Sequence, residues 1–334
     1  MVDLNRNFLG STLRTTSDSS FRNTGIYVQD EWSAIQSLNV VMGGRLDRSS
    51  ELDDPVFSPR IAVAIEASKT LKFRVGFSTG FRAPEVFSED LHIDTLGADQ
   101  VRIRNTQGLS EERAITGKVG VDWRSSALAP RWTFDATLSR TDVNDTFVLG
   151  EILNDGDGSL FQERANAAGS LIEGVEFNLG FQPATTLRLT AGVAYYRSRY
   201  DEAEVIFDNT PDGGSTVIAT RDYLEIPNWT GLAQAVWSPS ERFDAFLGLK
   251  YAGAIDALNN NAGTLNRTRD FWVVDLGFTR HFQIGTRHLD LSLGAKNLFD
   301  QRQRDLEAGA NRDSDYVYGP RFARSFYASL RYEF

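Results

Sequence analysis

The stretch Ser325–Phe334, which reads SFYASLRYEF, alternates between two kinds of side chain. Every second position is apolar or aromatic: Phe326, Ala328, Leu330, Tyr332 and Phe334. A period of two indicates a β-strand with one apolar face and one wet face. That apolar face turns inward in a soluble barrel or sandwich, and outward to lipid in a membrane barrel. The remaining sequence has to decide between these two arrangements.

The same alternation recurs along the chain. Leu289, Leu291, Leu293 and Ala295 alternate with Asp290, Ser292, Gly294 and Lys296. Charges in the middle of strands fit a polar lumen better than a dry core, where unpaired charge is costly. About 14 strands are expected, at 2–9, 23–32, 37–48, 57–66, 70–80, 111–124, 131–147, 168–181, 185–200, 225–237, 242–251, 270–282, 288–297 and 325–334.

The connections between these strands alternate in length. The short ones are 33–36, 67–69, 125–130, 182–184, 238–241 and 283–287, and the long ones are 49–56, 81–110, 148–167, 201–224, 252–269 and 298–324. Short turns on one rim and long loops on the other are typical of outer-membrane barrels. Trp and Tyr residues near the strand ends predict aromatic girdles at both membrane interfaces. The sequence therefore predicts an all-β fold, a transmembrane antiparallel β-barrel of outer-membrane type.

Composition restricts the class of protein further. The 334 residues carry 35 Lys and Arg against 45 Asp and Glu, a net charge of -10, which argues against nucleic-acid binding. The chain has no cysteine and therefore no thiolate metal site. No run of 18 apolar residues exists, so no transmembrane helix is expected. The first residues lack the features of an export signal, which an outer-membrane protein needs, so a mature or partial chain is expected.

Several short motifs carry a family resemblance. Residues 80–85 read GFRAPE, residues 297–300 read NLFD and residues 318–321 read YGPR before the terminal strand. Residues 27–32 (YVQDEW), 43–47 (GGRLD) and 57–60 (FSPR) precede or follow them in the expected order. Across about residues 21–334, this set resembles the TonB-dependent outer-membrane receptors. The terminal strand resembles the signal that the barrel-assembly machinery reads, with Phe334 as its last aromatic residue.

The resemblance implies both a fold and a function. It implies a 22-stranded barrel occluded by an N-terminal plug that contacts the TonB complex, and residues 1–334 would be the C-terminal barrel portion without the plug. About eight strands would then be missing. The implied function is TonB-energised uptake, across the cell outer membrane, of a scarce bulky solute such as a ferric siderophore, cobalamin or glycan. No cofactor and no catalytic residue are implied.

The candidate solute-binding residues lie at the expected pore mouth and in the long loop that follows it. They are Arg82, Glu89, Asp90 and His92. Arg82 would point inward at the mouth, and its structural role would be to pair with a lumen carboxylate such as Asp122. Acidic loops disfavour strongly anionic solutes, but they do not select among neutral and cationic ones.

Other motifs have simpler explanations. Residues 76–80 read GFSTG and match the hydrolase nucleophile elbow at Ser78, but they lie within an alternating strand rather than between a strand and a helix. Residues 154–159 (NDGDGS) hint at calcium but lack the glycine and glutamate spacing of an EF-hand, which favours an acidic turn. His281 and His288 flank a predicted periplasmic turn and are expected to face solvent.

Three alternatives to a receptor stay open on this basis. A complete 14-stranded passive channel would need no upstream plug. An outer-membrane hydrolase would use Ser78 as its nucleophile. A non-functional fragment would neither conduct solutes nor catalyse a reaction. An open sheet of 14 strands would leave two unpaired edges in lipid, so a partner or a closure is required.

Overall fold

The protein is described by a computed structural model that covers residues 2–8, 11–17, 21–84, 101–126, 130–154, 160–210, 213–259, 261–309, 313, 316–320 and 322–333. These residues form strands, turns and irregular connections. They contain no helix long and apolar enough to cross a membrane. The fold is therefore all-β, as the sequence predicts.

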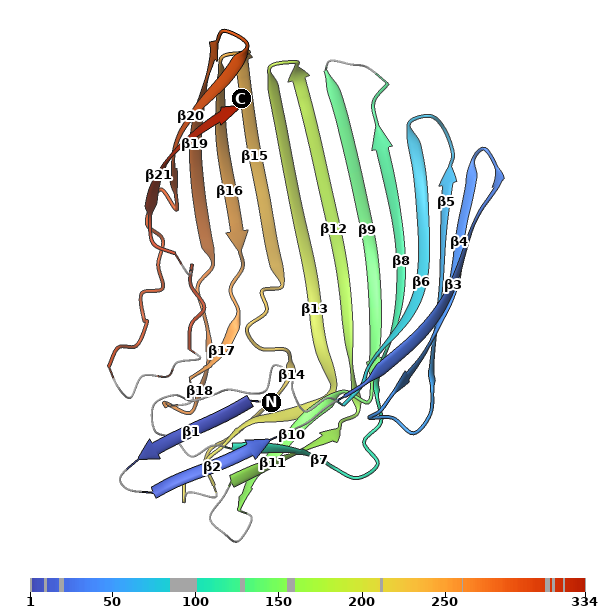
Figure 1. The fold of residues 1–334 in the computed structure, drawn as a ribbon, viewed down its shortest axis with the longest axis vertical. Coiled ribbons are helices and arrows are strands. Elements are labelled where there is room, and N and C mark those ends of the chain that lie inside the picture. Colours follow the sequence, from blue (N-terminus) through green and yellow to red (C-terminus); the bar gives the residue numbers. More distant parts are fainter. Residues whose placement is uncertain are drawn as a thin grey trace.

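One large antiparallel sheet dominates the structure (Figure 1). Of its 14 strands, β14 pairs only with an extension of β13, which leaves 13 strands in the wall. They are β3 (Asn23–Ile35), β4 (Leu38–Ser49), β5 (Val56–Glu66), β6 (Leu71–Arg82), β8 (Glu112–Arg124), β9 (Arg131–Asn144), β12 (Gly169–Ala184), β13 (Leu187–Asp208), β15 (Trp229–Ser240), β16 (Phe243–Ala252), β19 (Phe271–Ile284), β20 (Arg287–Lys296) and β21 (Ser325–Glu333). Each wall strand pairs with its neighbours along the chain, except that the edge strands β3 and β21 have one wall partner each.

The first expected strand does not belong to this wall. Residues 2–9 were expected to form a wall strand, but β1 (Val2–Phe8) pairs with β2 (Ser11–Ser17) in a separate two-stranded sheet. A period of two marks a strand but does not say which sheet the strand joins. The wall expected at about 14 strands therefore has 13 in the described part of the chain.

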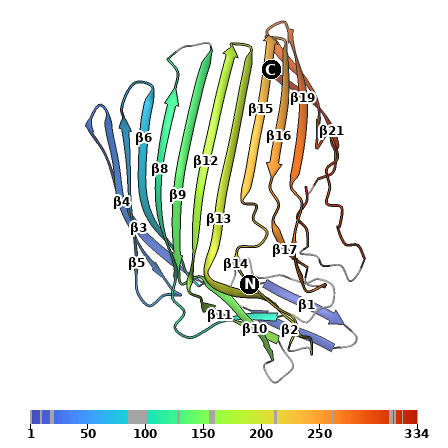
Figure 2. The ribbon, with the colours of Figure 1, turned by 180° about the vertical axis from the view of Figure 1, so that it is seen from behind.

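The two rims of the wall differ as the sequence predicts. Turns such as 36–37, 185–186 and 285–286 lie at one rim, at the top of Figure 1. The long connections gather at the other rim with their own short strands, and the β1–β2 hairpin lies at that end as well (Figures 1 and 2). Those strands are β7 (Val101–Asn105), β10 (Phe147–Asn154), β11 (Leu160–Asn166), β14 (Val217–Asp222), β17 (Asp256–Asn259) and β18 (Thr264–Arg267). By this pattern, the first rim is periplasmic and the second is extracellular.

Some strand ends differ from expectation for local reasons. The strand expected at 131–147 divides into β9 and β10 because Asp145 has a positive φ of 56°, which no extended strand accommodates. The strand expected to end at residue 200 continues as β13 to Asp208, where β14 pairs with it. The polar residues of that extension favoured a loop in the sequence. In the structure, pairing with β14 satisfies the hydrogen-bonding capacity of their backbone groups.

The outer face of the wall is apolar and exposed. Leu293 faces Phe278 on β19 and Ala328 on β21, and Leu293 is 51% exposed. Leu330, on the same face, is 67% exposed. No helix and no second sheet of the described chain covers these side chains (Figures 1 and 2). An apolar face of this extent suits lipid rather than water.

Aromatic pairs lie near both ends of the outer face. Trp132 and Phe181 stack at 3.9 Å between ring centroids near the periplasmic rim. Tyr195 and Trp229 lie 4.8 Å apart near the extracellular rim, where Tyr251 and Trp272 form a second pair at 4.5 Å. These pairs lie where the girdles are expected, because rings of this kind favour the two membrane–water interfaces.

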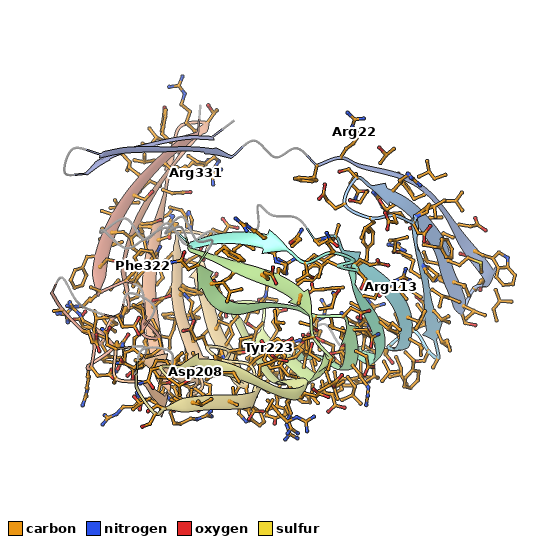
Figure 3. All side chains as sticks on the ribbon, turned by 90° about the horizontal axis from the view of Figure 1, so that it is seen from below. Arg22, Arg113, Asp208, Tyr223, Phe322 and Arg331 are labelled. Atoms are coloured by element: carbon orange, nitrogen blue, oxygen red, sulfur yellow. The ribbon has the colours of Figure 1, made fainter. Side chains whose placement is uncertain are left out.

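The wall is open between its two edge strands. Viewed along the strands, it curves through most of a ring, with Arg22 near one edge and Arg331 near the other (Figure 3). β3 ends at the short turn 36–37, and β21 ends beside the start of β20, where Glu333 faces His288. Both edge strands therefore run from the extracellular rim to the periplasmic rim.

Candidate functional site

The concave face of the wall carries linked polar groups. The Arg74 Nε donates to Asp122 Oδ2 at 2.6 Å, and the Lys250 Nζ lies 2.9 Å from Asp275 Oδ2. The Thr116 and Thr141 hydroxyls join β8 to β9 at 2.8 Å. Arg74 and Asp122 are 45% and 40% exposed, so this pair is hydrated and contributes little to stability. The face is a wet lining suited to a polar solute path.

Arg82 closes β6 at the extracellular mouth. Its Nη1 lies 3.7 Å from the Glu112 Oε2, and its guanidinium lies 5.7 Å from the centre of the Phe147 ring. Glu112 also accepts the Phe147 backbone N–H at 2.6 Å. Arg82 therefore pairs with a carboxylate, as expected, but the partner is Glu112 and not Asp122, since the strand register sets Arg82 opposite Glu112 and Asp122 opposite Lys72.

A second arginine approaches the same ring. The Arg164 guanidinium lies 5.7 Å from the Phe147 ring centre, and Arg164 is only 1% exposed. Its backbone carbonyl accepts the Thr106 N–H at 3.0 Å. The three side chains form one patch at the mouth, in which Arg82 is paired with Glu112 and Arg164 is buried. Sequence reasoning missed Arg164 because it lies in a long connection, where residues 160–166 (LFQERAN) show no alternation that would mark a strand.

The loop strands form a small sheet that fixes this patch. β11 pairs with β10 in antiparallel orientation and with β7 in parallel orientation. The Asn166 amide donates to the Ser110 and Asp145 carbonyls at 3.1 and 2.7 Å. The sheet therefore connects the loop after β6 to the loop after β9, which brings Arg82 and Arg164 together.

The last extracellular connection, 297–324, has its own polar cluster. The Tyr316 hydroxyl donates to the Asp305 Oδ2 at 3.2 Å, and the Tyr318 hydroxyl donates to the other oxygen. Burial alone would raise the pKa of Asp305, but the hydrogen bonds outweigh it and lower that pKa. Burial and the Asp305 carboxylate raise the pKa of Tyr318, so its hydroxyl remains a donor.

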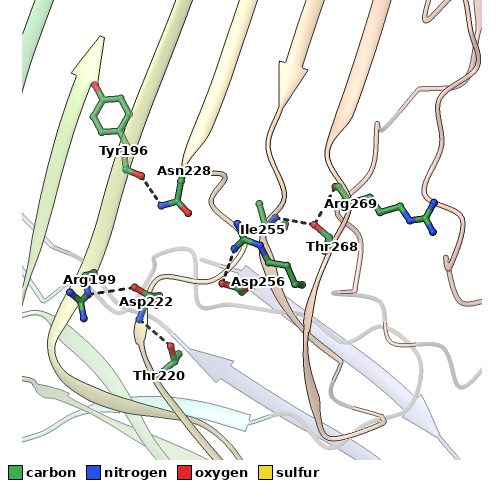
Figure 4. A network of polar contacts seen from close by, with 10 residues as sticks. Tyr196, Arg199, Thr220, Asp222, Asn228, Ile255, Asp256, Thr268 and Arg269 are labelled. Carbon is green, nitrogen blue, oxygen red and sulfur yellow. Dashed lines mark hydrogen bonds and ion pairs between the residues drawn. The ribbon is translucent and has the colours of Figure 1, made fainter.

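A polar cavity of about 430 Å³ opens in the wall near the extracellular rim. It lies between β13 and the connections after β14 and β16, the region shown in Figure 4. The Asn228 amide donates to the Tyr196 carbonyl at 2.8 Å, and the Arg267 Nη1 lies 3.0 Å from the Asp256 Oδ2. The sequence did not indicate this cavity, because its residues come from separate connections.

The other sequence candidates have mixed outcomes. Glu89, Asp90 and His92 lie outside the described residues, as do residues 155–159 of the acidic turn and Phe334. Ser78 lies in the continuous strand β6, opposite Arg60 and Thr116, and not at a strand–helix turn. The described residues contain no group of three or more His, Cys, Asp or Glu that could hold a metal ion.

His281 differs from expectation. It was expected to face solvent beside a periplasmic turn, but its Nδ1 lies 2.7 Å from Asp290 and its Nε2 lies 2.9 Å from Asp244. The side chain is 31% exposed. Because the three residues come from β19, β20 and β16, the contact joins three adjacent strands near the periplasmic rim.

Residues 3–298 match the family model described as TonB dependent receptor-like, beta-barrel. The chain belongs to this family. Its fold agrees with that of solved TonB-dependent receptors: a mutant of the ferric enterobactin receptor of Pseudomonas aeruginosa superposes with a TM-score of 0.68 at 16% identity, over 93% of this chain and 45% of that one. The siderophore receptor PirA of Acinetobacter baumannii gives 0.69 at 17% identity, over 94% and 46%.

A curated relative of this TonB-dependent receptor chain is the iron-regulated outer membrane virulence protein of Vibrio cholerae. The two are 22% identical over 296 residues, which are 86% of this chain and 42% of that protein. The chain therefore spans less than half the length of the relatives it matches. As a member of this family, it is a protein of the Gram-negative outer membrane.

Proposed function

We propose that residues 1–334 are the C-terminal barrel portion of a receptor, without its plug, that takes up a ferric siderophore through the outer membrane. The observation that carries this proposal is the family match over residues 3–298, together with a wall that is apolar outside and polar inside. The solved neighbours named above are receptors for siderophores. Among ferric siderophore, cobalamin and glycan, they favour the first.

Strand direction supports a larger barrel. The edges β3 and β21 both run toward the periplasmic rim, so a direct bond between them would be a parallel pair. Bacterial outer-membrane barrels are antiparallel throughout and have an even number of strands. Completing a wall of 13 strands therefore takes an odd number of further strands, and nine of them would give 22. A second copy of the chain cannot close the barrel, because both of its edge strands also run toward the periplasmic rim and would pair in parallel with β3 and β21.

The solute-binding proposal keeps the residues expected at the mouth. Arg82, Glu89, Asp90 and His92 are proposed to contact the solute, and Arg82 is the one of them that the structure describes. The Arg82 side chain is 46% exposed, so its remaining guanidinium donors can reach a solute in the pore mouth. Energy would come from the TonB complex acting through a plug, and assembly would use the terminal strand with Phe334.

We propose no catalytic role. Ser78 lies within the continuous wall strand β6, opposite Arg60 and Thr116, and not at the strand–helix turn that a nucleophile elbow requires. If a Ser78→Ala change in the complete receptor abolished an esterase activity of the wild type, this part of the proposal would be overturned.

Uptake by cells tests the function. In iron-limited cells that express the complete receptor, accumulation of radiolabelled iron from ferric enterobactin is expected to need both the receptor gene and TonB. Accumulation that persists without TonB would support the passive channel instead. If no ferric siderophore accumulates while labelled cobalamin or a glycan does, the siderophore assignment is wrong.

The closure proposal has a separate test. The chain has no cysteine, so Tyr27→Cys and Ser329→Cys place single thiols on the two edges of the wall. In the complete receptor, these thiols are expected not to form a disulfide under oxidation. Thr116→Cys with Thr141→Cys, whose native hydroxyls lie 2.8 Å apart on the neighbouring strands β8 and β9, is the positive control. A bond between the edges at control yield would show that the wall closes on itself.

A further inference from the structure

The hydrogen-bond ladder of β13 is interrupted near the extracellular rim. Its pairing with β15 ends where Tyr195 faces Trp229, and its pairing with β14 begins where Arg199 faces Asp222. Between these points, Asn228 supplies the contact, accepting the Tyr196 N–H and donating to the Tyr196 carbonyl, both at 2.8 Å. The cavity of about 430 Å³ lies at this interruption.

A second cavity of about 470 Å³ adjoins the first and shares Tyr195, Asn228 and Arg267 with it. Its other lining residues include Trp229 and Tyr251. Tyr195 lies on the same face of β13 as the lipid-facing Val193, and Trp229 and Tyr251 continue that face on β15 and β16. The second cavity therefore opens on the outside of the wall, at the extracellular aromatic girdle.

Some of the charged residues around the two cavities are ion-paired and others are not. Asp256 is paired with Arg267 at 3.0 Å, and the Arg199 Nε lies 3.5 Å from Asp222. Arg197 is the next outward-facing residue after Tyr195, and it is exposed. Among the described residues, its side chain has no ion pair or hydrogen bond, which leaves a guanidinium available to a ligand. Asp270, at the second cavity, is available to accept hydroxyl donors.

We propose that this outward-facing pair of cavities binds the phosphorylated sugar headgroup of a glycolipid in the outer leaflet. Arg197 binds the phosphate, for which a guanidinium has matched donor geometry. The rings of Tyr195, Trp229 and Tyr251 pack against the sugar, and Asp270 accepts its hydroxyls. A lipid source fits better than a dissolved solute, because aromatic girdles lie at the height of the headgroups.

Lipid retention tests the proposal without any siderophore. The complete receptor, purified from nanodiscs that contain phosphatidylcholine and a small fraction of diphosphorylated lipid A, is analysed by native mass spectrometry. Arg197→Gln is expected to reduce lipid A retention about tenfold, the effect of one charged contact. The matched control is Arg280→Gln, which removes another exposed, outward-facing arginine, on β19 near the periplasmic rim, that lines neither cavity.

The possible outcomes separate clearly. Retention by the wild type and by Arg280→Gln, with loss in Arg197→Gln and in Trp229→Leu, supports the site. No retention by the wild type, or equal loss in both arginine variants, overturns it. Equal retention of phosphatidylglycerol, which has a phosphate but no sugar, overturns the glycolipid class. Displacement of lipid A by equimolar glucose 1-phosphate would show that a free sugar phosphate is the ligand.

Discussion

At the scale of single residues, the ring of Tyr327 lies over two glycines of neighbouring strands. A Cβ added at Gly294 would lie 2.4 Å from the ring, and one added at Gly277 would lie 2.9 Å from the hydroxyl. Glycine at these positions lets a lumen-facing ring lie flat on the sheet, so that the terminal strand packs against β20. Sequence alone showed Gly294 as a polar-face residue but gave no reason for it.

This contact predicts the effect of a single methyl group. Gly294→Ala in the complete receptor is expected to displace Tyr327 and to lower the free energy of unfolding by about 1–3 kcal/mol, the usual effect of overpacking. Gly80→Ala, where a Cβ meets nothing within 4 Å, is the control and is expected to be nearly neutral. Urea unfolding in lipid vesicles measures both, and equal effects would contradict the packing argument.

The carboxyl of Asp305 gives a pH-dependent prediction. Its pKa in the folded protein lies below the ordinary value of 3.8, so its contribution to stability is present above that value. The contribution is lost as the pH falls through the lowered folded-state pKa. Protection of the Tyr318 amide, which donates to the Gln303 Oε1 at 3.0 Å, should decrease over that interval.

Amide hydrogen exchange, corrected for intrinsic rates, measures this loss. Asp305→Asn should show weaker protection of Tyr318 at neutral pH and little further change on acidification. An unchanged pH profile in that variant would show that another group controls the loop.

At the scale of elements, the wall strands were predictable because each one alternates in hydrophobicity, as Leu289 to Lys296 do in β20. The loop strands were not, because β7, β17 and β18 have only four or five residues each and face neither lipid nor a regular lumen. The Arg82–Glu112 pairing needed the β6–β8 register, which the intervening connection conceals from sequence reasoning.

One carboxylate connects two of these loop elements. Glu307 in the last connection accepts hydrogen bonds from the amides of Asn259 and Asn261 at 2.7 and 3.2 Å, and from the Asp313 N–H at 2.8 Å. Asn259 is only 7% exposed, so the loss of its acceptor leaves a buried donor unsatisfied.

Glu307→Ala is therefore expected to speed hydrogen exchange in β17 and β18 about tenfold. Exchange in the distant hairpin β4–β5 should not change. Glu204→Ala, in the extension of β13, is the control for removing a loop charge. If hydrogen exchange in β17 and β18 rises equally in both variants, the net charge of the loops stabilises these strands, and the Glu307 hydrogen bonds do not.

At the scale of the whole molecule, the sequence predicted the class of fold, the rims and the faces, because lipid and water impose the same alternation on every strand. The count of 14 strands exceeded the wall by one, since the run near the N-terminus forms its own hairpin. The wall therefore has an odd number of strands, 13, in the described part of the chain. Because its two edge strands run in the same direction, further antiparallel strands are needed to close it.

The most direct test of the account uses β20 in the complete receptor. The chain has no cysteine, so spin labels can be placed singly from Leu289 to Lys296 in lipid bilayers. With one face in lipid and the other in the lumen, oxygen accessibility is expected to peak at Leu289, Leu291, Leu293 and Ala295, while accessibility to a polar nickel chelate peaks at Asp290, Ser292, Gly294 and Lys296. Equal accessibility at all eight positions, or peaks in the opposite register, would contradict it.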